Sequence, residues 1–187
     1  AGSEQDVLDR VYRAATRFGV SVIVRVTPDC PMLDPEVSGR VLAEFRRPEG
    51  RADYVSNVHP PTFPDGLDTE VFSREALEVA WRETRLPSDR EHVTAYIWRR
   101  PERFRLANVA NADDLSALRW TVDTAADLEF ARAVHAALDG AGRVFGMDDV
   151  LRLLASRPDL RGINAGQRRN EGFEKSLTAD AAARADR

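Results

Sequence analysis

Residues 20–35 read VSVIVRVTPDCPMLDP. Residues 20–27 are nearly all apolar or β-branched, which is typical of a strand buried on both faces of a parallel sheet. Asp29 follows at once, and Asp34 with Pro35 has the pattern of a helix N-cap and first helical residue. This stretch therefore predicts a strand that ends near an aspartate and is followed by a helix.

Residues 118–129, LRWTVDTAADLE, repeat that arrangement around Asp123. Thr124 and Asp127 predict a capping box for the next helix, which leaves Asp123 free at the end of the preceding strand. In open α/β sheets, ligands bind beyond the carboxyl ends of the strands. Mg2+ is commonly held by one or two carboxylates, with substrate phosphates and water completing its octahedron. The two aspartates therefore predict a metal–nucleotide site.

Predicted strands alternate with predicted helices along the rest of the chain. Strands are expected at residues 52–58, 67–72 and 104–109, with a further strand ending at 121–123, while the proline-rich segment 59–66 is expected to be a loop. Helices are expected at residues 7–18, 35–45, 73–85, 88–99, from 124 onward and at 148–156. This order predicts an α/β fold with a mostly parallel sheet.

Composition limits the classes of function. The 187 residues have a formal net charge of −4, so no basic surface for nucleic acid or an anionic membrane is expected. No apolar run approaches the roughly 20 residues that a membrane-spanning helix needs. Cys30 is the single cysteine, which excludes an internal disulfide and favours a reducing compartment. We therefore expect a cytoplasmic protein.

The sequence resembles the cytidylyltransferases of the spore-coat polysaccharide biosynthesis type, which are related to the synthetases of CMP-activated acidic sugars. The resemblance rests on six groups of motifs in the family's order. They are GSE and DVLDR (2–4, 6–10), RVT and DCP (25–27, 29–31), FPDGLD and EVF (63–68, 70–72), SDREHVT (88–94), RWTVDT and DLE (119–124, 127–129), and INA and RNEG (163–165, 169–172).

The resemblance implies a Rossmann-like nucleotidyltransferase fold, a three-layer α/β sandwich. Residues 1–140 then correspond to the C-terminal two-thirds of a cytidylyltransferase domain, 141–177 to a C-terminal helical extension, and 178–187 to a polar tail. The family's opening strand and the arginine- and glycine-rich loop that grips the triphosphate and part of the base have no counterpart here. We therefore expect an N-terminally truncated chain that is weakly active alone.

The family's reaction transfers CMP from CTP to a sugar hydroxyl. By resemblance, Asp29 and Asp123 are the catalytic residues and hold Mg2+, the expected cofactor. The acceptor, an unidentified acidic or modified sugar, would be bound by Asp65, Gly66, Asp68, Glu70, Glu91 and His92. The family signature at residues 170–172 has no chemistry that we can assign.

Several of these residues also have an ordinary structural explanation. Asp29 could support the turn at Asp34 and Pro35, and Asp123 gains from a helix dipole without any metal. Asp65 with Gly66 is a common turn pair. Glu91 could be only the capping-box partner of Ser88. Cys30 beside Asp29 is expected to be a small buried side chain rather than a nucleophile.

Other hypotheses concern the whole assembly. The chain could be a split or non-catalytic module that binds nucleotide or sugar and needs a partner polypeptide to supply the missing opening segment. It could also be a segment of a larger multifunctional protein. Relatives commonly pair through their second half, so the resemblance also implies a homodimer.

Overall fold

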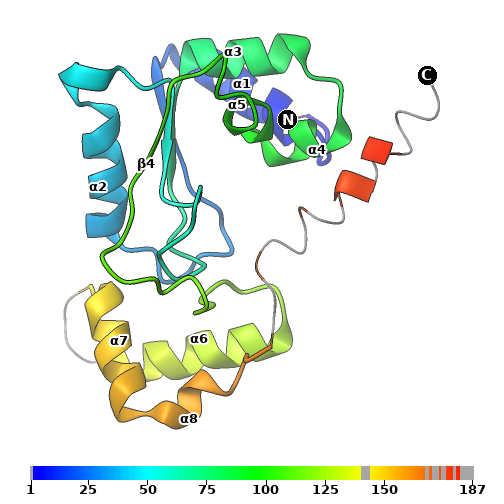
Figure 1. Cartoon of the computed structure of the whole chain (residues 1–187). Helices are drawn as coiled ribbons and strands as arrows, with labels where there is room; N and C mark the ends of the chain where they lie inside the picture. The colour runs from blue at the N-terminus through cyan, green and yellow to red at the C-terminus, as the bar shows by residue number, and fades with distance from the viewer. Residues whose placement is uncertain are drawn as a thin grey trace.

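The computed structural model describes residues 2–139, 144–166, 169, 173, 176–178, 180 and 181. Figure 1 follows these elements along the chain. Their bounds are α1 (Val7–Phe18), β1 (Val22–Arg25), α2 (Pro35–Phe45), the 3-10 turn η1 (Pro48–Gly50), β2 (Tyr54–Ser56), β3 (Glu70–Ser73), α3 (Arg74–Glu83), α4 (Pro87–His92), α5 (Ala95–Trp98), β4 (Leu106–Asn108), α6 (Ala125–Leu138), α7 (Met147–Ser156) and α8 (Pro158–Arg161).

The strands form one mixed sheet in the order β1-β3-β2-β4. β3 is antiparallel to both of its neighbours, with Val71 opposite Val24 on one side and Val55 on the other. β2 and β4 are parallel, with Val55 opposite Ala107. The α/β class is therefore confirmed, but the expected mostly parallel pairing is wrong for these strands. β1, β2 and β4 do run the same way, and β3 lies reversed between them because the 57–69 connection brings the chain straight back along β2.

Helices cover both faces of the sheet and make three layers (Figure 1). On one face, α2 packs over β2, β3 and β4, and Val41 meets Val55 and Val71. On the other face, α1, α3 and α5 surround Tyr54 and Phe72, and α4 packs on α1. Side chains alternate between the two faces along each strand, so Tyr54 and Val55 enter different clusters.

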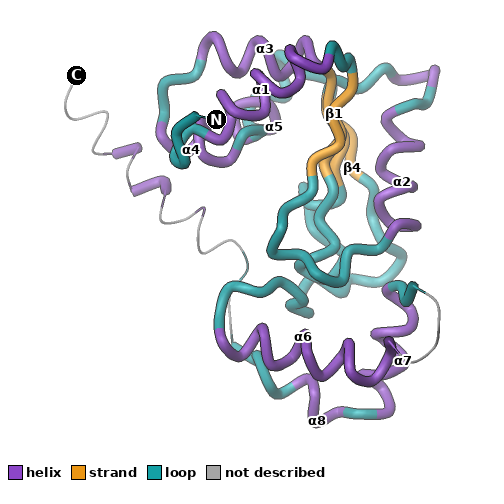
Figure 2. Tube along the Cα trace, turned by 180° about the vertical axis from the view of Figure 1, so that it is seen from behind, coloured by secondary structure: helices purple, strands orange, loops and turns teal. Residues whose placement is uncertain are grey.

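A second helical group lies beyond the carboxyl ends of β2 and β4. Figure 2 shows α6, α7 and α8 there, below the loops that leave the sheet. Their core includes Phe130, Val134 and Leu154, and it takes in Phe63 and Trp120 from the two loops. The two loops are therefore anchored in the hydrophobic cluster of this helical group.

Local sequence chemistry fixes most helix ends as expected. Asp34 caps α2 by accepting from the backbone N–H groups of Glu36 and Val37, and Ser73 caps α3. Gly19 ends α1 in the left-handed conformation, at φ 63°. The predicted capping box of α6, formed by Thr124 and Asp127, is confirmed.

Two predicted elements are wrong. The helix expected over 88–99 is divided into α4 and α5 at Val93, whose φ is 62°. The strand expected to end at 121–123 is replaced by an extended loop with one isolated bridge, between Asp65 and Arg119. Long-range hydrogen bonds accompany both changes. Thr94, next to Val93, donates from its hydroxyl to Glu70, and the Val122 N–H donates to the Asp29 carbonyl.

The N-terminal strand has apolar side chains in solvent. Val22 and Val24 of β1 are 40% and 49% exposed, on the face that α2 covers elsewhere. No helix within the described ranges has the length and apolar character to cross a bilayer.

Substitution of Gly66 tests the packing of the loop that follows β2. The φ of Gly66 is 109°, and an added Cβ would lie 2.8 Å from the carbonyl carbon of Trp120 and 2.9 Å from the nitrogen of Thr121. We expect Gly66→Ala to lower the free energy of unfolding by about 2–4 kcal/mol, measured by urea denaturation.

Gly39 provides the matched control, because it is exposed in the middle of α2 with nothing near its Cβ position. Gly39→Ala should raise the free energy of unfolding by about 0.5–1 kcal/mol. Equal effects of the two substitutions would contradict this description of the loop.

Candidate functional site

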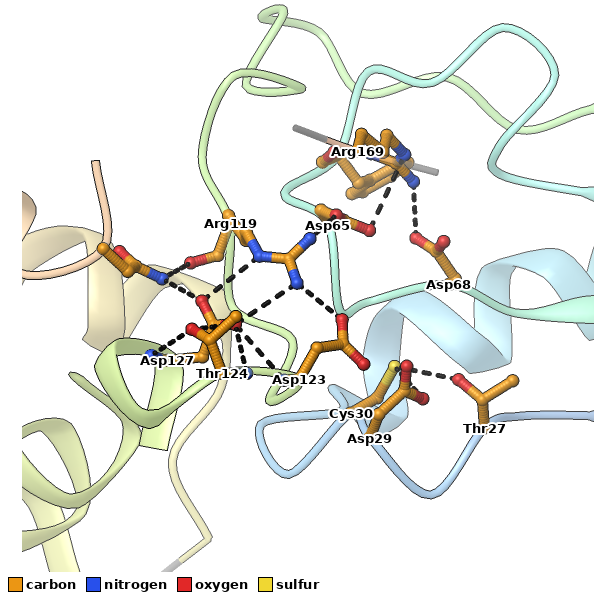
Figure 3. A network of polar contacts seen from close by, with 12 residues as sticks. Thr27, Asp29, Cys30, Asp65, Asp68, Arg119, Asp123, Thr124, Asp127 and Arg169 are labelled. Atoms are coloured by element: carbon orange, nitrogen blue, oxygen red, sulfur yellow. Dashed lines mark hydrogen bonds and ion pairs between the residues drawn. The ribbon is translucent and has the colours of Figure 1, made fainter. Parts of the chain in front are cut away.

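The loops that bear the two predicted aspartates meet at the carboxyl edge of the sheet. Asp29 follows β1, and the backbone N–H of Val122 donates to the Asp29 carbonyl oxygen at 2.8 Å. This bond fixes the loop that bears Asp123 against the loop that bears Asp29 (Figure 3). The fold therefore brings together two carboxylates that are far apart in the sequence.

Arg119 lies at the centre of the site. Its Nη2 is 2.5 Å from Asp123 Oδ2, its Nη1 is 3.3 Å from Asp65 Oδ2, and its Nε is 3.2 Å from Asp127 Oδ1. The Arg119 side chain is only 12% exposed. One cation thus joins the loop after β2, the loop before α6 and the first turn of α6 (Figure 3).

Asp127 anchors this network from a fully buried position. It accepts hydrogen bonds from the backbone and hydroxyl of Thr124, from the backbone of Asp123 and from the Nδ2 of Asn164 at 2.9 Å. Burial acts to raise its pKa, but the hydrogen bonds from Arg119 and Asn164 outweigh burial and lower the pKa overall. Asp127 therefore stays ionised, and its ion pair with Arg119 holds that side chain in place.

A second arginine, Arg169, binds the loop after β2. Its Nη2 is 2.6 Å from Asp68 Oδ1, its Nε is 3.7 Å from Asp65 Oδ1, and its Nη1 donates to the Phe63 carbonyl at 3.3 Å. Burial raises the pKa of Asp65, and it raises that of Asp68 to about 6. Sequence reasoning assigned no role to Arg169 or Arg119, although both lie in the quoted motifs. The signature at 170–172 lies outside the described residues.

Glu70 begins β3 at the same edge and is already well paired. Its carboxylate is bound by the cross-strand Arg25, accepts from Tyr54 Oη at 2.7 Å and accepts from Thr94 Oγ1 at 2.5 Å. These contacts orient Arg25. A role for Glu70 in substrate binding remains a prediction.

His92 ends α4 and contacts the C-terminal part of the chain. Its Nε2 lies 2.9 Å from Ser176 Oγ, and its ring meets Phe173 edge to face, with 5.0 Å between centroids. Burial lowers its pKa. The neighbouring Glu91 has a half-exposed side chain, 3.8 Å from His92 Nε2. Contact of either residue with a sugar remains a prediction.

The alternative capping role of Glu91 is not observed. The helix begins at Pro87 with no side-chain cap, and Ser88 instead donates from its backbone and hydroxyl to Asp180, at 2.9 and 2.6 Å. Ser88 is therefore bound to a residue 92 positions away in the chain and does not form the local capping box.

Cys30 is buried beside Asp29, with its sulfur 3.2 Å from Thr27 Oγ1. Burial raises the pKa of its thiol to about 12. A thiolate nucleophile is therefore strongly disfavoured, in agreement with the expected packing role.

The donor set fits a cation that arrives with nucleotide. Within the described residues, no cluster of three or more His, Cys, Asp or Glu side chains could hold a metal ion. Asp29 and Asp123 supply carboxylate oxygens, the ligand type that Mg2+ prefers, and Mg2+ usually takes its other ligands from substrate phosphates and water. The metal role of both residues remains a prediction.

The family model of the cytidylyltransferases matches residues 1–138. The chain belongs to the cytidylyltransferase family. Relatives include an uncharacterized protein of Methanocaldococcus jannaschii, 32% identical over 89% of this chain and 67% of its own length. The spore coat polysaccharide biosynthesis protein SpsF of Bacillus subtilis is 30% identical over 84% of this chain and 65% of its own length.

A solved cytidylyltransferase from Leptospira borgpetersenii has the same fold. It superposes with a TM-score of 0.82 at 28% identity, covering 90% of this chain and 69% of that one. The chain thus spans about two thirds of the length of the proteins it matches. The predicted division at residues 140 and 177 stays a prediction.

Asp68 gives the site a pH dependence of stability. Because burial raises its pKa to about 6, above the value of roughly 3.9 in an unfolded chain, the native state binds the extra proton between these values. Its contribution to stability is therefore present at low pH and is lost as the pH rises towards 6. Between pH 4 and 6.5, the free energy of unfolding of the wild type should fall by about 1–2 kcal/mol relative to Asp68→Asn.

Urea denaturation across this range measures the difference, with Asp53→Asn as the control. A hydrogen bond from Arg105 lowers the pKa of Asp53, so most of its contribution to stability is present above about pH 4 and is lost as the pH falls further. Parallel stability curves for the wild type and Asp68→Asn would contradict the assignment.

Proposed function

We propose that this cytidylyltransferase-family protein transfers CMP from CTP to a sugar hydroxyl. The supporting observation is the convergence of Asp29 and Asp123, tied by the Val122–Asp29 backbone bond at the carboxyl edge of the sheet. Family membership supports the reaction type. The likeness to a spore coat polysaccharide biosynthesis protein favours a sugar as the acceptor.

In this reaction, the acceptor oxygen forms a bond to the α-phosphorus of CTP as the bond from that phosphorus to the β-bridging oxygen breaks. The hydroxyl loses its proton, and pyrophosphate leaves. Bound Mg2+ would neutralise charge on the phosphate oxygens. The protein mainly supplies position and electrostatic stabilisation, as in other phosphate transfers.

Different residues at the sheet edge would bind the cation and the acceptor sugar. Asp29 and Asp123 would hold the cation and so orient the triphosphate. Arg119 and Arg169 keep Asp65 and Asp68 in place on the loop after β2. This loop, with Gly66, would form one side of the acceptor pocket. Glu70 with its partner Arg25, and His92 with Glu91, would form the side nearer β3 and α4.

The charges on that side suit an acidic or modified sugar. Arg25, ion-paired with Glu70, has a side chain that is 23% exposed, and a guanidinium binds carboxylates well. Because the chain spans two thirds of its relatives, the remaining contacts to CTP would come from outside these residues, through a preceding segment or a partner polypeptide. A homodimer is also part of this proposal.

Calorimetric titration with Mg2+ and CTP tests the proposed site. We expect weak, Mg2+-dependent binding by the 187-residue chain, and at least a tenfold loss of affinity in Asp29→Asn, since a coordinating carboxylate is removed. The matched control is Asp53→Asn, because Asp53 pairs with Arg105 just before β2, at the opposite edge of the sheet.

Circular dichroism would first show that each variant is folded. Equal Mg2+-dependent binding by the wild type and Asp29→Asn would contradict the proposed metal role. Turnover of CTP at the rate of a full-length relative would contradict the expected weak activity.

A further inference from the structure

The contacts of Arg119 differ in how exposed they are. Asp127 is fully buried and the Asp65 side chain is 9% exposed, whereas the Asp123 side chain is 54% exposed. Arg119 reaches Asp127 through Nε and Nη2, both at 3.2 Å, and Asp65 through Nη1. Its hold on the two buried carboxylates therefore does not depend on Asp123.

The carboxylate of Asp123 has an observed partner, Arg119, and a proposed partner, a divalent cation. In the structure its Oδ2 lies 2.5 Å from Arg119 Nη2, so the guanidinium neutralises it. The same carboxylate, beside Asp29, is the proposed ligand of a divalent cation. A cation at that oxygen and the guanidinium proton would repel each other at short range, so the two cannot share it at full strength.

The net charge of the groups around Asp123 favours the binding of a cation. The connected cluster holds the carboxylates of Asp65, Asp68, Asp123 and Asp127 with the guanidinium groups of Arg119 and Arg169, and Asp29 lies next to it. With all of them ionised, negative charge exceeds positive charge. The arginines therefore offset part of the repulsion among the carboxylates without removing the attraction for Mg2+.

We propose that Arg119 is a positioning residue that holds Asp123 beside Asp29 in the metal-free protein and gives it up when a divalent cation binds. This inference rests on the proposed function, because it takes Asp123 as a metal ligand. Asp127, Asp65 and Asn164 keep Arg119 in place during the exchange. Asp123, on the exposed side of the guanidinium, is the partner that changes.

The exchange predicts an unusual direction of effect. A ligand that must first lose another partner binds with an apparent affinity reduced by the fraction of the competent state. Weakening the Arg119–Asp123 contact should therefore tighten cation binding. If Arg119 served only to hold the loops together, the same change would weaken cation binding or leave it unaltered.

Arg119→Lys weakens this contact while keeping a positive charge. A lysine presents one compact ammonium group, which can stay with buried Asp127 but cannot span three carboxylates as a guanidinium does. Binding of Mn2+ without nucleotide is followed by the electron paramagnetic resonance of the free ion. We expect Arg119→Lys to bind Mn2+ between about twofold and fivefold more tightly than the wild type, the range that an exposed ion pair commonly represents.

Arg105→Lys is the matched control, because Arg105 forms a bidentate pair with Asp53 far from the site, just before β4. It should leave Mn2+ affinity unchanged. In Asp123→Asn, Mn2+ binding should fall at least tenfold, because the neutral amide is a weak ligand.

A second measurement uses the wild type and does not depend on the folding of Arg119→Lys. The 15N resonance of the Arg119 side chain should shift on titration with Mg2+ and saturate at the midpoint of cation binding, while that of Arg105 stays fixed. Equal or weaker Mn2+ binding by folded Arg119→Lys would overturn this inference but not the proposed function. The absence of a shift of the Arg119 resonance at saturating Mg2+ would do the same. Absence of any cation binding by the wild type, with and without CTP, overturns the proposed function as well.

Discussion

The buried carboxylate of Asp127 is the constraint on which the site depends. A fully buried charge must be paired and hydrogen-bonded, and removing one partner of such a pair commonly costs about 3–5 kcal/mol. Thr124, Asn164 and Arg119 meet this need together. Because Arg119 also reaches Asp65 and Asp123, the compensation of one anion fixes the loop after β2, the loop before α6 and the start of α6 relative to one another.

The sheet gives this network its place. β1, β2 and β4 run in one direction, so the segments that leave them meet at one edge, although β3 lies reversed among them. Asp29 follows β1, Asp65 and Asp68 follow β2, and Asp123 lies beyond β4. Carboxylates at a carboxyl edge suit the binding of a metal-bound nucleotide, and the reversed β3 brings Glu70 to the same edge. The mixed sheet thus assembles both halves of the proposed site.

Features with local causes could be predicted from the sequence, and those with distant causes could not. The caps at Asp34, Ser73 and Thr124 depend on residues two or three positions away. The place of Asp29 beyond a strand follows from the same kind of local pattern, whereas the strand expected before Asp123 is not formed. The direction of β3 depends on a 13-residue connection. Ser88 donates to Asp180 and forms no capping box with nearby Glu91. Asp68 is paired with Arg169, which is 101 residues away in the chain. Such partners have no periodicity or spacing that a single sequence displays.

The central claim is that Asp29 and Asp123 form one cation site next to Arg119. Paramagnetic broadening by Mn2+ in the 15N-labelled chain tests it most directly, because broadening falls steeply with distance from the ion. We expect the backbone amides of residues 29, 30, 66 and 122–124 to broaden first, while those of residues 53 and 105, at the far edge of the sheet, remain sharp. Broadening centred on any other acidic group, with residues 29 and 123 unaffected, would contradict the account.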